Sequence, residues 1–202
     1  MADADAKTTK RQATVLIDAY LVIAAKNGDR AAAESLAHRW RPRLLRTARR
    51  LLGDAALAED VVQEAWISIA RGIGRLIDPD RFPAFAFKIL HRRCVDAIRK
   101  RSKERDQSAS ASHGDHQSTD SQPEGSVDDR PQMHHRMAIS EAFAALPNDQ
   151  RLTAILFFAE GMTLKEISEA TDVPIGTVKS RVFHARQKLK ALLEGEKDDH
   201  II

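Results

Sequence analysis

The sequence predicts an all-α protein of two small helical domains joined by a flexible linker, the C-terminal one a helix-turn-helix. Apolar residues recur every three or four positions in both halves of the chain, and strand-like alternation of β-branched residues is absent. Between the halves, the stretch from Asp106 to Pro131 contains no Leu, Ile, Met or aromatic residue and is rich in serine and acids. Such a stretch buries too little apolar surface to offset its ordering entropy, so it separates two folded units.

We therefore expect five segments along the 202 residues. They are a disordered N-terminus (1–14), a helical domain (15–101), a flexible acidic Ser-rich linker (102–133), a second helical domain (134–194) and a C-terminal tail (195–202). One cysteine, Cys94, allows no internal disulfide and no cysteine-based zinc site. No signal-peptide pattern occurs, and the longest apolar stretch near the N-terminus, Ala19–Ala25, is too short to cross a bilayer. We expect a cytoplasmic protein without membrane insertion.

Helix start and stop signals divide the first domain. Leu57, Val61, Ala65 and Ile69 step by four and predict a buried stripe. Asp54 is a suitable N-cap for the helix that carries this stripe. The expected helices are Val15–Lys26, ended by Asn27-Gly28; Asp29–Leu52, with Pro42 inside and Gly53 at its end; Asp54–Gly72; and Phe82–Arg101.

The second domain contains the strongest local pattern in the chain. Thr163 and Glu166 fit a capping box that opens a helix ending near Thr171. A turn follows in which Asp172 suits the left-handed conformation. The remaining expected helices are His134–Leu146, Asn148–Glu160 and a last helix from an N-cap at Thr177 to Leu193.

The last helix is basic and has one apolar seam. No acidic residue occurs between Val173 and Leu193. A short helix, a tight turn and a basic helix form the arrangement that sets a recognition helix in the major groove of DNA. The alternative is a helical hairpin with a solvated basic face, which is disfavoured because the cap, the turn and the absence of acids coincide. The candidate duplex-DNA contacts are Thr177, Lys179, Ser180, Arg181, Phe183, His184, Arg186 and Lys188.

The segment from Phe82 to Arg105 is also basic and has three phenylalanines near its start. Cations near aromatic rings suit single-stranded nucleic acid, because rings stack on bases while cations contact phosphates. Phe87 is expected in the core, in a stripe with Cys94, whereas Phe82 and Phe85 fit the core and a stacking surface equally well. The candidate contacts to a melted strand are Phe82, Phe85, Lys88, Arg92, Arg93 and Arg99.

A third surface is acidic and lies on the predicted helix Asp54–Gly72. Its candidate protein-docking residues are Asp60, Gln63, Glu64 and Trp66, beside Glu59. Taken alone, such a patch is more often a solvated face.

These pieces resemble a known family in their motifs and in their order. The similar segments are Asp54–Glu64, Asp78–Arg101, Leu146-Pro147, Glu160–Thr163 and Val173–Arg181. They resemble the core-binding helix, the promoter-melting segment and the C-terminal domain of the extracytoplasmic-function (ECF) group of bacterial RNA polymerase sigma factors. Two unrelated motif sets in the right order are more specific than either set alone.

The resemblance implies an alternative sigma factor that binds core RNA polymerase, recognises −10 and −35 promoter elements and directs promoter melting, without catalytic residues of its own. Asp60, Gln63 and Glu64 would dock on the clamp coiled coil of the largest subunit, and the C-terminal domain on the beta flap. The segment around Phe82 would hold the melted −10 strand, and the recognition helix would contact the −35 duplex. An anti-sigma factor is an expected partner. Phe85, Ala86, Arg92 and His184 depart from residues common in the family, which affects promoter preference.

Three alternatives remain from the sequence. A DNA-binding regulator that uses only the helix-turn-helix leaves residues 54–101 unexplained. A sigma mimic that sequesters an anti-sigma factor would need no basic DNA surfaces. An enzyme is disfavoured because no phosphate-binding glycine loop or nucleophile motif occurs. No metal or cofactor is expected, since His113, His116, His134 and His135 lack regular ligand spacing.

Overall fold

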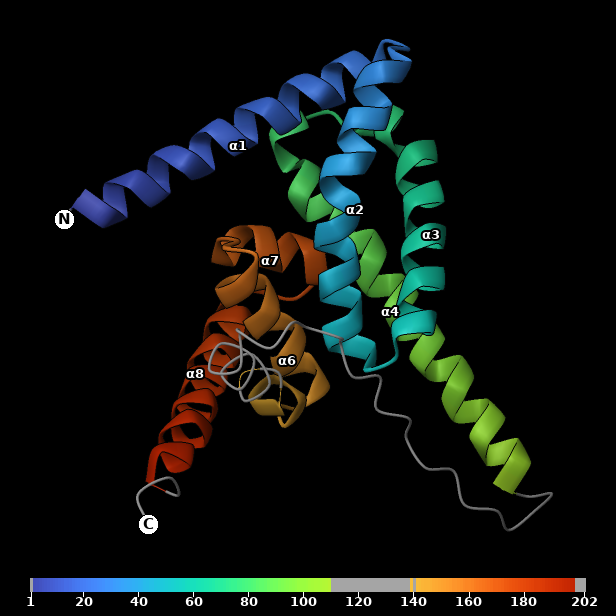
Figure 1. Ribbon diagram of the computed structural model, residues 1–202. Helices are drawn as coiled ribbons and strands as arrows, with labels where there is room; N and C mark the ends of the chain where they lie inside the picture. Colours follow the sequence, from blue (N-terminus) through green and yellow to red (C-terminus); the bar gives the residue numbers. More distant parts are fainter. Residues whose placement is uncertain (1, 110–138, 140, 199–202) are drawn as a thin grey trace, which may run out of the picture.

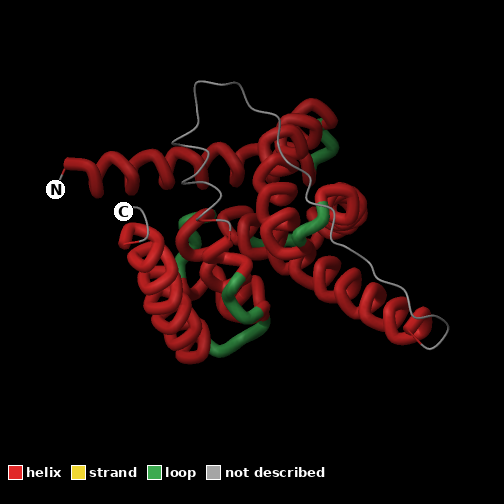
Figure 2. The backbone as a smooth tube through the Cα atoms, turned by 60° about the horizontal axis from the view of Figure 1, so that its bottom comes forward, coloured by secondary structure: helices red, strands yellow, loops and turns green. Residues whose placement is uncertain are grey.

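The computed structural model describes residues 2–109, 139 and 141–198, with side chains for 13–104, 139 and 141–192. Within these residues all regular structure is helical and no strand occurs, which confirms the predicted fold class (Figure 1, Figure 2). The α-helices are α1 (Ala2–Lys26), α2 (Arg30–Leu52), α3 (Ala55–Gly72), α4 (Phe82–Ala109), α6 (Asn148–Ala154), α7 (Leu164–Thr171) and α8 (Ile175–Asp198). Three short turns accompany them: the 3₁₀ turns η1 (Ile73–Arg75) and η2 (Pro79–Arg81), and the π-helical turn η3 (Ile155–Ala159).

Local capping chemistry sets the boundaries of α2 and α3 as predicted. The side chain of Asp29 accepts a hydrogen bond from the backbone N of Ala32 at 3.0 Å, and Asp54 accepts one from Leu57 N at 3.0 Å. Gly53 ends α2 in the left-handed conformation with φ 67° and donates its backbone N–H to the carbonyl of Arg49. These contacts satisfy backbone groups that a helix end leaves without intrahelical partners.

Trp40 of α2 lies at the centre of the N-terminal helices. Its indole is fully buried and meets the rings of Phe82 and Phe87 edge to face, with centroids 5.0 and 5.8 Å away. From α3, Val61, Ala65 and Ile69 join the same core, as their spacing predicted, while Leu57 is only partly buried. Helices α1, α2 and α3 all pack against α4, and α3 does so most extensively of the three.

Helix α1 begins at Ala2 and not at Val15, so residues 2–14, which were expected to lack structure, continue the predicted helix toward the N-terminus. The prediction used the apolar period, which starts only near Val15. Residues 2–14 contain neither Gly nor Pro and are rich in Ala and charged residues. Such a composition supports a helix through intrinsic propensity without an apolar face.

The C-terminal helices follow the predicted order. The capping box is confirmed, because Glu166 N donates to Thr163 Oγ1 at 3.2 Å and Thr163 N donates to Glu166 Oε2 at 2.6 Å. The expected helix Asn148–Glu160 is present as α6 followed by η3, and it ends before Gly161, which has φ 67°. Of the predicted helix 134–146, residues 134–138 and 140 lie outside the described residues, while 139 and 141–144 are helical.

Asp172 has φ 55°, the left-handed turn conformation expected from the sequence. The expectation that Thr177 caps the last helix is wrong, because α8 begins at Ile175. The carbonyl of Pro174 accepts hydrogen bonds from Thr177 N and Val178 N. Thr177 therefore lies inside the first turn of α8, and the chain enters this helix directly after the proline.

Two helix ends extend beyond the predicted segments. Helix α4 runs to Ala109 and α8 to Asp198, so residues 102–109 and 195–198 continue helices that were expected to end earlier. The remainder of the predicted linker lies outside the described residues. Within the described part of the chain, no helix is long and apolar enough to cross a membrane.

The two halves are packed against each other, which the sequence did not predict. One cluster of buried side chains contains Trp40, Phe87 and Leu90 of the first half together with Leu156 and Ile167 of the second. Helix α7 packs against α4, and α6 also contacts α2. The two domains therefore share apolar surface in this conformation.

Cys94 offers a test of the packing around α4. It is 2% exposed, and burial raises the pKa of its thiol to about 12. Because the thiolate is the reactive species, we expect no measurable reaction with Ellman's reagent at pH 8 in the native protein and complete reaction in denaturant. Equal reaction rates in both conditions would contradict this packing.

Candidate nucleic-acid interface

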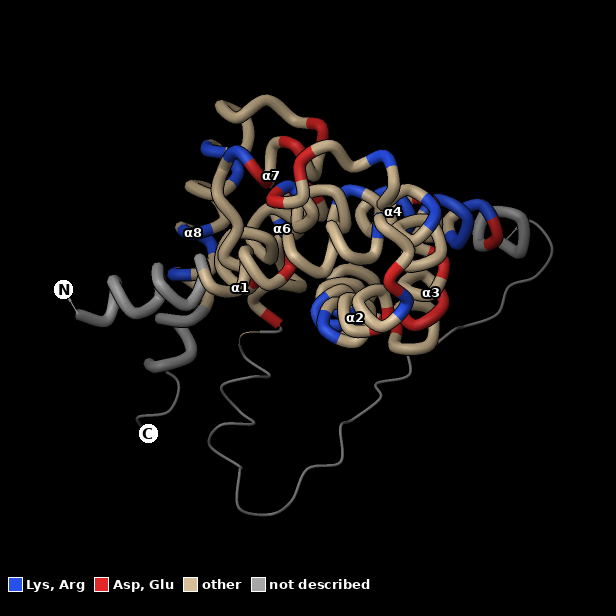
Figure 3. Tube along the Cα trace, turned by 90° about the horizontal axis from the view of Figure 1, so that it is seen from above, with Lys and Arg blue, Asp and Glu red and all other residues tan. Residues whose placement is uncertain are grey.

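The recognition helix α8 presents a basic outer face. Val178, Ala185 and Leu189 are buried on its inner side, which turns the intervening residues outward. Figure 3 shows lysine and arginine positions distributed along α8. The exposed predicted contacts on this helix are Thr177, Lys179, Ser180, Phe183, His184, Arg186 and Lys188.

Arg181 is the exception among the predicted duplex contacts. Its Nε lies 3.1 Å from Asp149 Oδ2 of α6, and its side chain is 25% exposed. In this conformation the ion pair holds the guanidinium beside α6, so Arg181 helps to orient α8. A contact from Arg181 to a base would require this pair to break.

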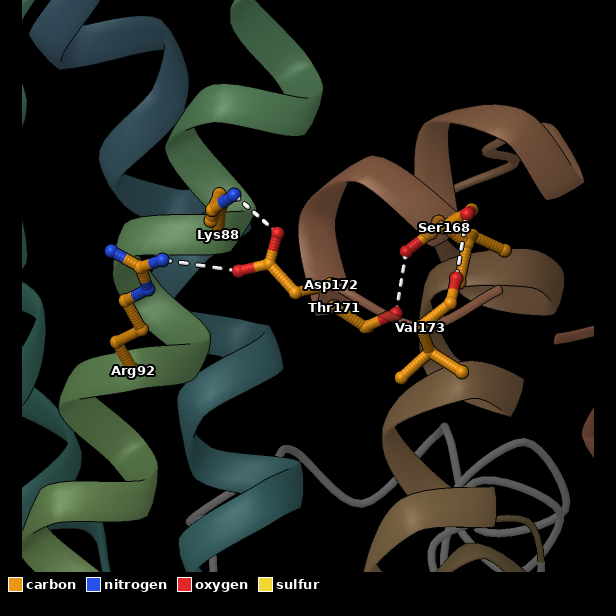
Figure 4. Close-up of polar contacts among 7 residues, drawn as sticks. Lys88, Arg92, Ser168, Thr171, Asp172 and Val173 are labelled. Atoms are coloured by element: carbon orange, nitrogen blue, oxygen red, sulfur yellow. Dashed lines mark hydrogen bonds and ion pairs between the residues drawn. The ribbon is translucent and has the colours of Figure 1, made fainter. Parts of the chain in front are cut away.

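The geometry of the helix-turn-helix is held by side-chain hydrogen bonds to the backbone. Ser168 Oγ donates to the carbonyl of Val173 at 2.6 Å, and Thr171 Oγ1 donates to the carbonyl of Ile167 at 2.7 Å (Figure 4). Together with the left-handed residue Asp172, these bonds fix the angle at which the chain leaves α7 for α8.

The three phenylalanines at the start of α4 divide between core and surface. Phe82 is fully buried against Trp40, so the expectation that its ring could stack on a base is wrong in this structure. Phe87 is 1% exposed, as predicted. Phe85 is only partly buried and borders an open pocket. The sequence left Phe82 and Phe85 undecided because both lie in the first turn of the helix, where flanking loops determine burial.

The pocket beside Phe85 has a volume of about 420 Å³. Lys26 Nζ of α1 donates a hydrogen bond to the carbonyl of Leu76 at 2.6 Å and so holds one side of the pocket in place. Asp78 caps η2 by accepting from Asp80 N at 3.0 Å. The lining residues are Gly72, Arg75, Leu76, Ile77, Asp78, Arg81 and Phe85.

This pocket combines one aromatic wall with two arginines, a set that the sequence analysis missed. The predicted cations lie within α4, whereas Arg75 and Arg81 come from the turns that precede this helix. Their position on either side of the Asp78-Pro79-Asp80 loop is the sequence feature that could have indicated this pocket. Arg81 is positioned by Asp78, with Nε 3.3 Å from Oδ2.

Phe85, Lys88, Arg92 and Arg99 step by three, four and seven along α4 and therefore share one face of the helix. Lys88 Nζ and Arg92 Nη2 both donate to the carboxylate of Asp172, the latter at 3.0 Å (Figure 4). The hydrogen bond from Lys88, followed by that from Arg92, holds the pKa of the Asp172 carboxyl below its usual range. Asp172 was predicted as a turn residue only, so this partnership is new.

Arg93 and Arg99 are placed differently from Lys88 and Arg92. Arg93 Nη2 donates to Ser68 Oγ at 2.9 Å, and its Nη1 lies 3.6 Å from Glu64 Oε2, so it joins α4 to α3. Arg99 is exposed farther along α4. Arg93 is therefore separated from the face shared by Phe85, Lys88, Arg92 and Arg99.

The predicted docking residues lie together on α3. Asp60, Gln63 and Glu64 are exposed, and Trp66 is partly buried against the core. Figure 3 shows acidic positions on α3. Among the described residues, no group of three His, Cys, Asp or Glu side chains is arranged to hold a metal ion.

Comparison with known proteins supports the assignment of both halves. Residues 36–104 match the model of sigma-70 region 2, and residues 136–189 match that of sigma-70 region 4. The ECF RNA polymerase sigma factor SigM of Mycobacterium tuberculosis is 31% identical over 177 residues, covering 87% of this chain and 84% of SigM. The RNA polymerase sigma-H factor of Pseudomonas aeruginosa is 26% identical over 183 residues, which cover 88% of this chain and 94% of the sigma-H factor.

A solved structure extends the likeness to the fold. The sigma factor RpoE of Bartonella quintana, crystallised with the anti-sigma factor NepR, superposes with a TM-score of 0.64 at 26% identity. The match covers 80% of this chain and 96% of RpoE.

The helix-turn-helix defines a helical DNA-binding protein, and the basic face of α4 is a second candidate nucleic-acid surface. The chain belongs to the ECF group of RNA polymerase sigma factors. It therefore binds core RNA polymerase, recognises promoter −10 and −35 elements and directs promoter melting and transcription initiation.

His91 gives the packed conformation a pH dependence. Burial lowers the pKa of His91 below 6.5, Arg181 and Arg92 lower it further, and Asp172 opposes them. The packed state thus favours neutral His91. The contribution of His91 to the free energy of unfolding is therefore fully present above pH 6.5 and declines as the pH falls below that value. We expect the urea midpoint to fall between pH 7.5 and pH 5.5, and to fall less in His91→Gln. Identical pH slopes for the two proteins would exclude a contribution from His91.

Proposed function

We propose that this sigma factor recognises −35 duplex DNA through the outer face of α8 and captures the melted −10 strand along α4. For the first contact, Lys179, Phe183 and His184 are exposed near the start of a helix whose opposite side is buried. This is the orientation in which the N-terminal residues of a recognition helix meet base edges in the major groove. Arg186 and Lys188 lie farther along and suit phosphate contacts.

The observation that carries the second contact is the pocket beside Phe85. Its volume of about 420 Å³ lies in the range of small-molecule sites, and its aromatic wall suits one extruded base. Arg75 and Arg81 at the rim supply positive charge for the adjoining phosphates. Lys88 and Arg92 continue the same cationic path along α4.

The remaining surfaces suit contacts with polymerase. Asp60, Gln63 and Glu64 form an exposed polar face on α3, and we assign it to the clamp coiled coil of the largest subunit. The C-terminal domain would contact the beta flap, and the segment between the domains would link the two sites. Polymerase supplies the chemistry, and the chain acts in the cytoplasm. The Bartonella quintana relative was crystallised with an anti-sigma factor, which supports the same kind of partner here.

Two glycines next to the pocket allow a matched test of base capture. A Cβ added at Gly72 would lie 3.0 Å from Cζ of Phe85, so Gly72→Ala must displace the ring. A Cβ at Gly74 meets nothing within 4 Å. We expect Gly72→Ala to reduce open-complex formation with core polymerase, measured by permanganate footprinting, by roughly fivefold, the low end of the range for loss of one stacked base, because the ring shifts only slightly. Gly74→Ala should match wild type.

A partial rescue distinguishes base capture from general damage. On a template already mismatched over the −10 element, Gly72→Ala should regain part of its activity, because unpairing costs no further free energy. Equal footprints for Gly72→Ala, Gly74→Ala and wild type on duplex promoters would refute the assignment of the pocket.

Separate substitutions test the polymerase-docking and duplex surfaces in the full chain. Asp60→Ala with Gln63→Ala should weaken binding to core polymerase at least fivefold, since central interface residues cost more than about 1 kcal/mol. Lys179→Ala should weaken duplex promoter binding roughly 5–100-fold and leave core binding unchanged. Lys179 is preferable to Arg181 because Arg181 also pairs with Asp149.

Fluorescence anisotropy with labelled protein measures the first affinity, and run-off transcription on a promoter library measures the combined effect. If the double variant on α3 binds core polymerase as tightly as wild type, the docking face is misassigned. If Lys179→Ala leaves duplex binding unchanged, this lysine does not contact DNA.

A further inference from the structure

Every ion pair described between the two halves has its cation in the first half and its acid in the second. Arg43 Nε lies 3.1 Å from Glu160 Oε2, and Glu160 Oε1 also accepts from Thr47 Oγ1 at 3.2 Å. This pair is the most buried, with the Glu160 side chain 4% exposed. The other pairs are Arg81 with Glu169 at 3.5 Å, Lys88 with Asp172, and Arg92 with Asp172 at 3.0 Å.

Asp172 places its carboxylate between two cations of α4, Lys88 and Arg92. Its two carboxylate oxygens each accept from one cation, Lys88 on one side and Arg92 one turn farther along (Figure 4). The left-handed conformation at φ 55° places this side chain at the tip of the turn between α7 and α8. The same two cations, four residues apart on one helix face, are available to a strand phosphate when Asp172 is absent.

Apolar packing supports these ion pairs. Ile167 and Ala170 on α7 are buried in the same cluster as Phe87 and Leu90 of α4. Helix α7 therefore covers part of α4 next to the cationic face, and Glu169 of α7 engages Arg81 at the rim of the pocket. A strand that follows α4 from the pocket past Arg92 would therefore compete with Glu169 and Asp172 for the same cations.

We propose that the turn of the helix-turn-helix and α7 act as an autoinhibitory latch, in which Asp172 and Glu169 occupy the melted-strand surface of α4 until the two halves separate. The proposal rests on the assignment of α4 to the melted strand made above. In the closed state, the cations that would bind phosphates are already neutralised by the chain itself. Binding to core polymerase, whose docking sites for the two halves are separate, would then release the surface.

The latch lowers the affinity of the free protein for single-stranded DNA by a calculable rule. The apparent dissociation constant equals the intrinsic constant divided by the fraction of open molecules. Asp172 and its two partners are exposed to solvent by a third or more, so salt screens these pairs. Removing the Asp172 charge should therefore raise the open fraction by a modest factor that shrinks at high salt.

The test uses the full chain and a fluorescently labelled 20-nucleotide oligo(dT) as probe. Asp172→Asn removes the charge and keeps a residue that tolerates the left-handed conformation. Glu34→Gln is the matched control, since it causes the same change in net charge at an exposed pair with Arg30 on α2. We expect Asp172→Asn to bind the probe roughly threefold tighter than Glu34→Gln in 0.1 M salt, in line with the loss of exposed ion pairs. The ratio should approach one in 0.5 M salt.

Further variants separate the latch from the strand surface itself. Glu169→Gln should act in the same direction as Asp172→Asn, which guards against a folding defect in the turn. Adding Lys88→Gln and Arg92→Gln to Asp172→Asn should abolish the gain. That result, with the tighter binding of Asp172→Asn, supports the latch.

Two results would overturn it, and they differ in what they leave standing. If Lys88→Gln with Arg92→Gln weakens binding in the wild-type background but neither acid substitution tightens it beyond Glu34→Gln, the latch is wrong and the strand surface stands. If no substitution at Lys88, Arg92, Glu169 or Asp172 changes binding, both the latch and the assignment of α4 are wrong.

Discussion

The organisation of this protein depends on one helix, α4, which has to serve several surfaces. Its inner face buries Phe82 and Phe87 against Trp40, and this burial fixes where the helix lies. Because side chains three or four positions apart share a face, the same placement turns Lys88 away from the aromatic core and leaves Phe85 at its edge, with its ring centroid 6.3 Å from that of Phe82. The apolar core therefore determines the position of the cationic face, and damage to the core would displace the nucleic-acid surface as a whole.

A helix exposed on one basic face attracts any acidic surface within reach, and here the nearest one belongs to the same chain. Asp172 is suited to this contact because the tight turn that shapes the helix-turn-helix also projects its carboxylate. The turn residue thus has a structural role within its own domain and an electrostatic role toward the other. Substitutions that keep the turn, such as asparagine, separate the two roles, whereas a residue that cannot adopt φ 55° would disturb both.

Sequence reasoning succeeded where local chemistry decides the outcome. The capping box at Thr163, the caps at Asp29 and Asp54 and the left-handed Asp172 each depend on residues within a few positions of one another. It failed where distant parts meet: the burial of Phe82 depends on Trp40, forty-two positions away. The packing of the two halves could not be predicted for the same reason. Nothing in the sequence shows which distant cations and acids will pair when the chain folds.

The candidate site shows the same division in a form that affects function. The cations of α4 were evident from composition, but the pocket was not, because its walls come from the end of α3, two short turns and the start of α4. Lys26 of α1 fixes one rim through the carbonyl of Leu76, so even a distant helix contributes to its shape. The candidate site therefore has two parts. One is the row of cations on α4, and the other is the pocket that the turns form. In the proposed mode of binding, the helix would provide charge along the strand and the turns would shape the space for one base. Promoter preference could then change in the turns without altering the helix that holds the core.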